Sequence, residues 1–333
     1  MGFSAIAGVH YDSRKLASPT LSLFAFVFLL AICVTRNQTA LNMEAVKAFS
    51  SSAIGEHVIY MKPPTGWIIP NGKTLKLNAT LNGLKQSSCI WYTRVDHFIR
   101  GRGFARMVAE PCVYCRWSEG KFLSIVKIYN DDCRLQCDRP ADVKAKFPST
   151  DSEEDTFLGI KIQQRKESVV DGRIVAGSLM TSGEKYVDKV LTRLKMQDCH
   201  PYETPAAEGL KLVPFDEAVN VSLPFPYEEL CGCLGWIAAT SHPEIKFAVN
   251  QLKKFVRRPS GAHVRAAKRV LRHLSGCKAA TQIYHQGDQN GLVELVLFAD
   301  ADFAGEAPKS GAKASTSCIV LFAKGVGLLH FVS

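Results

Sequence analysis

Two adjacent aspartates, Asp131 and Asp132, are the residues of this 333-residue sequence best suited to metal chemistry. They follow a β-rich run over residues 122–129, and residues 133–137 alternate back as a second strand. The pattern predicts a hairpin with residues 130–132 at its turn. A polar turn is one interpretation, because Asn and Asp favour turns. The other is a pair of carboxylates held on rigid strands to bind a divalent metal.

Cysteine and histidine offer a second kind of metal chemistry. The sequence has 11 cysteines, an odd number in a chain too large to need disulfides, which favours reduced thiols. Two closely spaced cysteine pairs come near a four-cysteine zinc pattern, formed by Cys112, Cys115, Cys133 and Cys137. The first pair flanks a segment typical of a strand, which weakens this alternative. The 9 histidines are scattered, and we expect no cluster of histidine ligands.

Composition and missing motifs exclude several classes of protein. A hydrophobic fraction of 47% and a charged fraction of 22% exclude whole-chain disorder, collagen and coiled coil. The sequence has no G-x-S-x-G elbow and no H-E-x-x-H motif. Residues 305–316 lack the P-loop spacing, because Ala312 separates Gly311 from Lys313.

Positive charge is concentrated in one stretch. The net charge is +10, and residues 246–278 contain many basic residues but no acidic one. The spacing predicts helices over residues 243–256 and 260–274, the second with Ser260 as its N-cap and Gly276 as the C-terminal stop. Its cations lie largely off the apolar stripe, so they could contact a polyanion such as nucleic acid. The alternative is a solvated helix face. The candidate contacts are Lys253, Lys254, Arg257, Arg258, Arg265, Lys268, Arg269 and Arg272.

Other elements must position these groups. Residues 21–34 form an apolar run shorter than the roughly 20 residues of a membrane span, so we expect a buried helix and no stable membrane insertion. Helical spacing marks residues 88–100 and 182–196. An apolar strand over residues 292–299 should end at Asp300, with a partner strand over residues 316–321.

Several segments resemble, in order, the polymerase region of copia-type retrotransposon polyproteins. Residues 129–132 (YNDD) are similar to the Y-x-D-D box of reverse transcriptases. LNATLNGLKQ at residues 77–86 resembles L-N-K-S-L-Y-G-L-K-Q, and residues 157–160 match F-L-G-I. Residues 263–272 are close to H-x-x-A-A-K-R-V-L-R. On these motifs the sequence is identified as a member of that family over about residues 8–333.

The resemblance implies RNA-directed DNA synthesis with two Mg²⁺ (or Mn²⁺) ions held by three carboxylates. Asp131 and Asp132 match two of them. The third belongs to a D-V-K-x-A-F motif, which aligns with Glu44 without a gap and with Ala45 after a one-residue shift. Glutamate is one methylene longer and would displace a metal, whereas alanine would remove a ligand. We therefore expect this copy to be weak or inactive.

The resemblance continues into an RNase H domain that is incomplete. Asp300 matches its first catalytic and metal-binding aspartate, and the later ligands would fall beyond Ser333. Cleavage by two metals needs all of them, so we expect no autonomous RNase H activity. From the resemblance we also expect the finger segments that precede the palm to be nearly absent.

The expected fold is α+β in four parts. Residues 1–147 form a reverse-transcriptase palm sheet with packed helices, and residues 148–225 form the palm end, a thumb-like segment and a loop. Residues 226–284 form a basic helical connection, and residues 285–333 form a truncated RNase H-like α/β start. Implied partners are an RNA/DNA template–primer duplex and dNTPs, in the cytoplasm or nucleus, with the oligomeric state open. The alternatives are a non-catalytic nucleic-acid-binding remnant and a zinc-stabilised structural protein.

Overall fold

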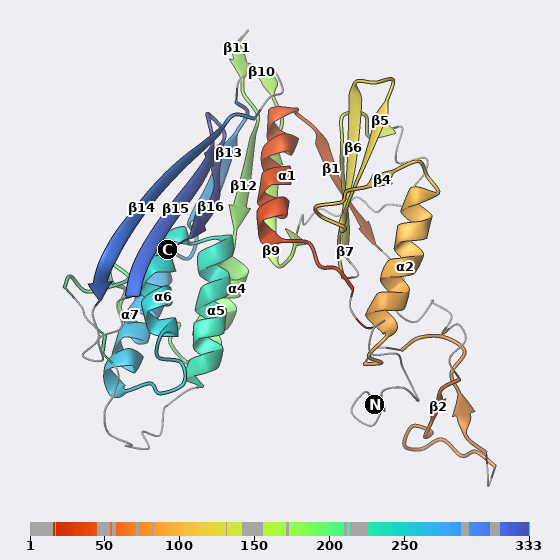
Figure 1. Cartoon of the computed structure of the whole chain (residues 1–333), viewed down its shortest axis with the longest axis horizontal. Helices are drawn as coiled ribbons and strands as arrows, with labels where there is room; N and C mark the ends of the chain where they lie inside the picture. Colours follow the sequence, from red (N-terminus) through yellow and green to blue (C-terminus); the bar gives the residue numbers. More distant parts are fainter. Residues whose placement is uncertain are drawn as a thin grey trace. The chain divides into compact units, whose positions relative to one another are not determined.

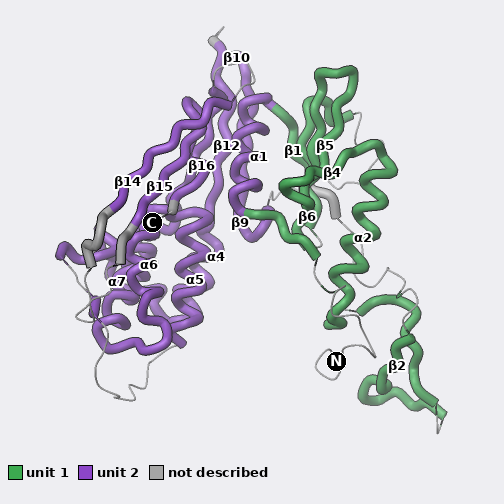
Figure 2. Tube along the Cα trace, in the orientation of Figure 1, with its two compact units in different colours: residues 1–22, 38–152 green, residues 23–37, 153–333 purple. Residues whose placement is uncertain are grey.

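The computed structural model describes residues 16, 18–44, 54, 58–70, 73–81, 83–130, 132–141, 156–170, 173–209, 212–213, 226–287, 293–306 and 314–332. The chain forms two compact units, drawn in separate colours in Figure 2. Unit 1 comprises residues 1–22 and 38–152, and unit 2 comprises residues 23–37 and 153–333. Both contain helices and antiparallel strands, which confirms the α+β class.

The centre of unit 1 is an antiparallel sheet with the strand order β1-β7-β6-β5-β4. Its strands are β1 (Thr39–Glu44), β4 (Ala105–Arg106), β5 (Val113–Ser118), β6 (Phe122–Tyr129) and β7 (Asp132–Cys137). β6 and β7 form the predicted hairpin. The expectation that Asp132 lies in the turn is wrong, because it pairs with Tyr129 as the first residue of β7.

Helix α2 (Ser87–Arg100) covers one face of this sheet and confirms the helix predicted over residues 88–100. Trp91, Val95 and Ile99 recur at four-residue spacing on one side of the helix and are buried. They pack with alternate residues of β5, β6 and β7 into one apolar core. A separate strand pair, β2 (Tyr60–Met61) with β3 (Leu75–Lys76), completes the described elements of unit 1.

Unit 2 contains a sheet with the order β13-β12-β9-β8. Its strands are β8 (Thr156–Phe157), β9 (Ile160–Arg165), β12 (Ser178–Ser182) and β13 (Thr281–His285), and β10 (Ser168–Val170) pairs with β11 (Arg173–Val175). Helix α1 (Leu23–Thr35) lies against β12 and β13 (Figure 1), so the apolar run forms the predicted buried helix. Within the described residues, we find no helix with the length and apolarity to span a bilayer.

The helices of unit 2 share one apolar core. They are α4 (Glu184–Arg193), α5 (Tyr227–Thr240), the 3-10 helix η3 (Pro243–Ile245), α6 (Lys246–Lys253) and α7 (Gly261–Cys277). The predicted stripe on α7 is buried, and Ser260 caps the helix together with His263. The expected stop at Gly276 is wrong, since the helix continues to Cys277.

A third sheet in unit 2 is formed by β14 (Leu295–Glu306), β15 (Ala314–Ala323) and β16 (Gly327–Val332) in that order. The predicted pairing of the first two strands is confirmed. The expectation that the first strand ends at residue 299 is wrong, because its backbone stays paired with β15 through Asp302. The four-part division of the chain stays a prediction.

Candidate functional site

The hairpin that carries the two aspartates stands next to β1. Asp132 lies opposite Tyr129 of β6 and opposite Glu44 of β1, and its side chain is exposed. Directly opposed residues in antiparallel strands have Cα atoms about 4.5–5.5 Å apart. Asp131, the Glu44 side chain and Ala45 lie outside the described residues. The backbone register therefore brings Glu44 beside Asp132, and the alignment of the family's aspartate with Glu44 or with Ala45 stays a prediction.

Trp91 of α2 holds the turn of the hairpin. Its indole Nε1–H donates to the backbone carbonyl of Asn130 at 3.0 Å, and its ring is buried in the core beneath the sheet. Asn130 adopts a positive φ of 53°, which asparagine tolerates better than most residues. The sequence indicated only that Trp91 belongs to an apolar helix face, because a contact between positions 39 residues apart has no local signal.

A chain of buried polar groups sets the register between β1 and the hairpin. Lys127 and Arg134 are cross-strand partners in the hairpin, and both are fully buried. Lys127 Nζ donates to Gln136 Oε1 at 2.6 Å, and Gln136 Nε2 donates to Gln38 Oε1 at 3.0 Å. Gln38 Nε2 then donates to Asp138 Oδ1 at 2.8 Å. Since Gln38 immediately precedes β1, these bonds favour the register that aligns the acidic positions.

A second polar cluster fixes α2 against the far strands of the sheet. Asp96 of α2 is buried, accepts a hydrogen bond from Tyr114 Oη at 3.0 Å and pairs with Arg106 at 3.4 Å. Burial, followed by hydrogen bonds involving Tyr92 and Asp96, raises the pKa of Tyr114. Tyr114 therefore keeps its proton near neutral pH and remains a hydrogen-bond donor to Asp96, which holds α2 in place as a support for the turn.

The predicted nucleic-acid contacts divide into two groups. Side chains that are exposed lie at the end of α6, in the connection to α7 and on α7 itself; they are Lys253, Lys254, Arg257, Arg258, Arg265 and Lys268. Arg269 and Arg272 are instead half-buried. Arg269 Nη2 donates to Thr204 Oγ1 at 2.8 Å, and Arg272 Nε donates to the His200 carbonyl at 2.5 Å. Both guanidinium groups also lie over the Tyr202 ring, at 4.4 and 4.0 Å. These two arginines thus anchor the loop before α5.

Asp300 is exposed within β14, opposite Cys318 of β15. Its Oδ1 accepts a hydrogen bond from the Ala301 backbone N–H at 3.0 Å. Among the described residues, no other His, Cys, Asp or Glu joins Asp300 in a group of metal-binding dimensions.

The four-cysteine zinc hypothesis is not supported by the geometry. All four cysteines are described, and their sulfur atoms do not form a compact ligand group. Cys115 lies within the strand Val113–Ser118, whereas Cys112 lies in the turn that precedes it, so the two cysteines do not share one regular element. Burial, with a smaller contribution from Glu110, raises the pKa of Cys112 to about 12, and burial also raises the pKa of Cys115.

One histidine does belong to a group of possible metal ligands, which has mixed chemistry. His242, Glu244 and Cys277 place ligand atoms within 4.8 Å of one another. His273 reaches the same carboxylate, with its Nε2 at 4.0 Å from Glu244 Oε1. The sequence does carry a signal, His-Pro-Glu at residues 242–244 and His-x-x-x-Cys at residues 273–277, but only the fold brings the two pairs together.

Comparisons with known proteins agree on one family. The profile of the family described as reverse transcriptase (RNA-dependent DNA polymerase) matches residues 1–208. The chain is 28% identical over 341 residues to the retrovirus-related Pol polyprotein from transposon TNT 1-94 of Nicotiana tabacum, covering 97% of the chain and 24% of that protein. It is 27% identical over 316 residues to the Pol polyprotein from transposon RE1 of Arabidopsis thaliana, covering 92% of the chain and 20% of that protein. The chain thus spans a quarter or less of the length of these relatives.

Proposed function

The chain belongs to the reverse transcriptase family, in the form found in copia-type retrotransposon polyproteins, and we propose that it is a polymerase palm whose nucleotidyl-transfer activity is weak or lost. The observation that carries this proposal is the strand register that aligns Glu44 with Asp132, next to the Asp131 position. The three positions are those at which the family resemblance expects the metal-binding carboxylates.

These residues fit a hard divalent cation. Asp132 is exposed at the start of its strand, and carboxylate oxygens are the ligands preferred by Mg²⁺ and Mn²⁺. Such ions, when bound, activate the primer 3′-hydroxyl and neutralise charge on the triphosphate. The chain's own contribution is to hold the carboxylates on a hairpin whose turn is fixed by Trp91 and whose register is fixed by Gln136 and Gln38.

Glu44 is the reason to expect impairment. The backbone keeps the position that an aspartate would occupy, but the glutamate side chain carries one more methylene. A misplacement of about 1 Å in a reacting geometry can cost about 100-fold in rate. We therefore expect a retained backbone frame in which one proposed ligand is displaced.

The exposed cations support binding of a template–primer duplex. They follow one another along the end of α6 and the outer side of α7, where phosphates could be neutralised without reading sequence. dNTPs are the proposed small substrates. The Asp300 region corresponds by resemblance to the first strands of RNase H, and we propose no cleavage activity for it.

Primer extension on an RNA template tests the proposal. The wild-type chain, with Mg²⁺ or Mn²⁺, is compared with Glu44→Asp and with the double variant Asp131→Asn/Asp132→Asn. Glu119→Gln, an exposed acid at the β5–β6 turn, is the matched control. We expect slow or no extension by wild type, a gain of up to about 100-fold in Glu44→Asp, and none in the double variant. Efficient wild-type extension that Glu44→Asp leaves unchanged would contradict the proposed impairment.

A second candidate function is nucleic-acid binding without catalysis, favoured by the set of exposed cations. If all six contact phosphates of a duplex, the logarithm of affinity should fall with the logarithm of salt concentration with a slope of about −5. If no variant extends the primer but salt-dependent binding is observed, the result favours nucleic-acid binding without catalysis. Absence of salt-dependent binding to the duplex would contradict both nucleic-acid proposals.

A further inference from the structure

Two distant segments of unit 2 bring four ligand-type side chains together. His242 and Glu244 lie where α5 ends and η3 begins. His273 and Cys277 lie on α7, four residues apart, and therefore on the same face one turn from each other. A pair from a turn facing a pair from a helix is an arrangement that structural zinc sites commonly use.

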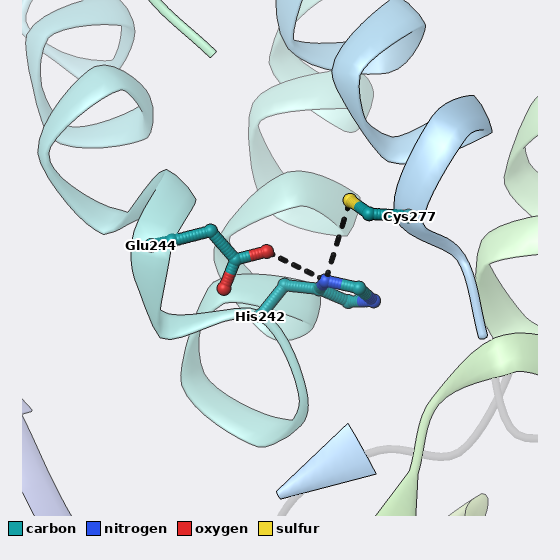
Figure 3. Close-up of side chains that lie close together, drawn as sticks. All are labelled: His242, Glu244 and Cys277. Atoms are coloured by element: carbon teal, nitrogen blue, oxygen red, sulfur yellow. Dashed lines mark hydrogen bonds and ion pairs between the residues drawn. The ribbon is translucent and has the colours of Figure 1, made fainter. Parts of the chain in front are cut away.

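The ligand atoms converge (Figure 3). His242 Nδ1 lies 2.7 Å from Glu244 Oε1 and 4.0 Å from Cys277 Sγ. His273 Nε2 lies 4.0 Å from the same Glu244 oxygen. Tetrahedral Zn²⁺ with bonds of about 2.0–2.3 Å places its ligand atoms roughly 3.3–3.8 Å apart. The ligand atoms of His242, Glu244 and Cys277 already lie within 4.8 Å of one another, and His273 would have to move its Nε2 inward from its place beside Glu244 to complete a set of four.

The orientation of His273 is that of a ligand. Its Nδ1 lies 3.1 Å from the Tyr202 backbone carbonyl, which can only accept a hydrogen bond. Nδ1 must therefore carry the hydrogen, and in the neutral ring the Nε2 lone pair faces the Glu244 carboxylate. Metal-binding histidines typically donate their other ring N–H to a carbonyl or carboxylate in this way. A cation bound beside Glu244 would therefore meet a nitrogen lone pair of His273 as well as the carboxylate.

Burial makes this arrangement costly without an occupant. The His242 imidazole is fully buried, and only 12% of the His273 side chain is exposed. Within the described part of the chain, Nε2 of His273 has no hydrogen-bond partner. An unsatisfied buried polar atom costs about 1–3 kcal/mol and calls for an explanation such as a bound ion. Glu244 is 42% exposed and provides the route by which an ion can reach the site.

We propose that His242, Glu244, His273 and Cys277 form a tetrahedral Zn²⁺ site that ties the end of α5 to the C-terminal turn of α7. Two nitrogens, one sulfur and one oxygen suit a borderline-soft cation such as Zn²⁺ and are a poor match for Mg²⁺, which prefers oxygen alone. The site is thus chemically distinct from the carboxylate positions on the hairpin of unit 1. It fixes a structural junction and takes no part in the polymerase chemistry.

Cobalt substitution tests the proposal on the full chain. The protein is purified under reducing conditions, stripped of metal with a chelator and titrated with Co²⁺ as the probe. We expect one equivalent to give the visible spectrum of tetrahedral cobalt with a thiolate-to-cobalt charge-transfer band, and Zn²⁺ to displace it. Cys277→Ser should lose the charge-transfer band, and His273→Gln should weaken binding at least tenfold.

Cys199→Ser is the matched control, because Cys199 is half-buried in the same unit and its Sγ faces Ser275 Oγ at 3.5 Å. It should retain the wild-type spectrum. A cobalt spectrum without a thiolate band, or a band unchanged in Cys277→Ser, would overturn the proposal. If Cys277→Ser fails to fold, as judged by circular dichroism, the affinity of His273→Gln decides. None of these measurements depends on polymerase activity.

Discussion

Unit 1 buries charge inside its sheet, whereas the helical core of unit 2 buries apolar side chains. The charged residues with little exposure among those described are Asp96, Lys127 and Arg134, and all three lie in unit 1. The buried polar residues described in unit 2 are uncharged hydroxyl and imidazole groups, such as Thr240, Ser260 and His263.

The contrast shows two ways of fixing geometry. A helix core aligns its elements by shape, and cations on its outside can be changed with little effect on packing. A sheet can slip by one residue and reverse the side of every side chain, so its register needs specific partners. Unit 1 uses a buried lysine and two glutamines for this purpose, in the same ladder of strands that pairs Glu44 with Asp132.

Leu271→Ala should have the largest effect on stability. Leu271 is fully buried at the centre of α7, and removing its branched side chain leaves a cavity. We expect a loss of about 3 kcal/mol in the free energy of unfolding, measured by urea denaturation. Leu271→Met, which conserves volume, should cost less than about 1.5 kcal/mol. Equal effects of both variants would contradict a core aligned by shape.

Gln136→Leu should have the second-largest effect on stability. It should act by weakening the register of β1 against β7. The substitution removes the acceptor of the Lys127 ammonium and the donor to Gln38, so it disturbs a hydrogen-bonded buried charge. We expect a loss of about 2 kcal/mol. Hydrogen exchange should accelerate in β1 and β7 before it does in α2. Gln163→Leu on an exposed position of β9 is the control and should change stability by less than about 0.5 kcal/mol.

The elements that the sequence predicts are those with a local signal. The α7 stripe repeats at helical spacing from Val264 to Leu274, and Ser260 marks its start, so both helix and buried face follow from the sequence. The β6–β7 hairpin likewise follows from two β-rich runs around a turn. Asp132 lies in the strand and not in the turn predicted over residues 130–132. It pairs with Tyr129, so the turn is one residue shorter than predicted.

The remaining contacts depend on residues far apart in the sequence. Lys127 lies in a β-rich run that gives no local sign of a buried charge, and only the fold shows that Gln136 accepts its hydrogen bond and in turn bonds Gln38. Arg269 is separated by 65 residues from Thr204, so α7 looks uniformly cationic until the loop is placed against it. His242 and Cys277 are 35 residues apart and meet for the same reason.

Paired substitutions on α7 separate binding from stability within one helix. Arg269→Ala/Arg272→Ala removes the contacts to the 200–204 loop and should cost about 1 kcal/mol of stability. Arg265→Ala/Lys268→Ala removes two exposed cations and should leave stability within about 0.5 kcal/mol. The second pair should instead reduce the magnitude of the salt slope of duplex binding by about 2. An unchanged slope would remove Arg265 and Lys268 from the proposed interface.

His263→Gln should have the smallest effect on the free energy of unfolding. The effect should be seen only below neutral pH. Burial lowers the pKa of His263, whose Nδ1 accepts the Ser260 N–H at 2.8 Å and faces Ser260 Oγ at 2.7 Å. Protonation would place a hydrogen on Nδ1 and break the acceptor side of the helix cap. As pH falls below the ordinary histidine value of about 6.5, the unfolded chain takes up this proton first, so the folded state loses stability until its own lower pKa is reached.

Glutamine at the same position can retain the bond to the Ser260 N–H without a titrating ring. Urea denaturation at pH 7.5 and at pH 5 should therefore show a smaller acid loss for His263→Gln than for wild type. A general packing defect would lower stability equally at both pH values. Such a parallel shift would show that the neutral imidazole is not what the cap requires. In that case, unlike the sheet of unit 1, the helices of unit 2 would not depend on a specific buried polar group.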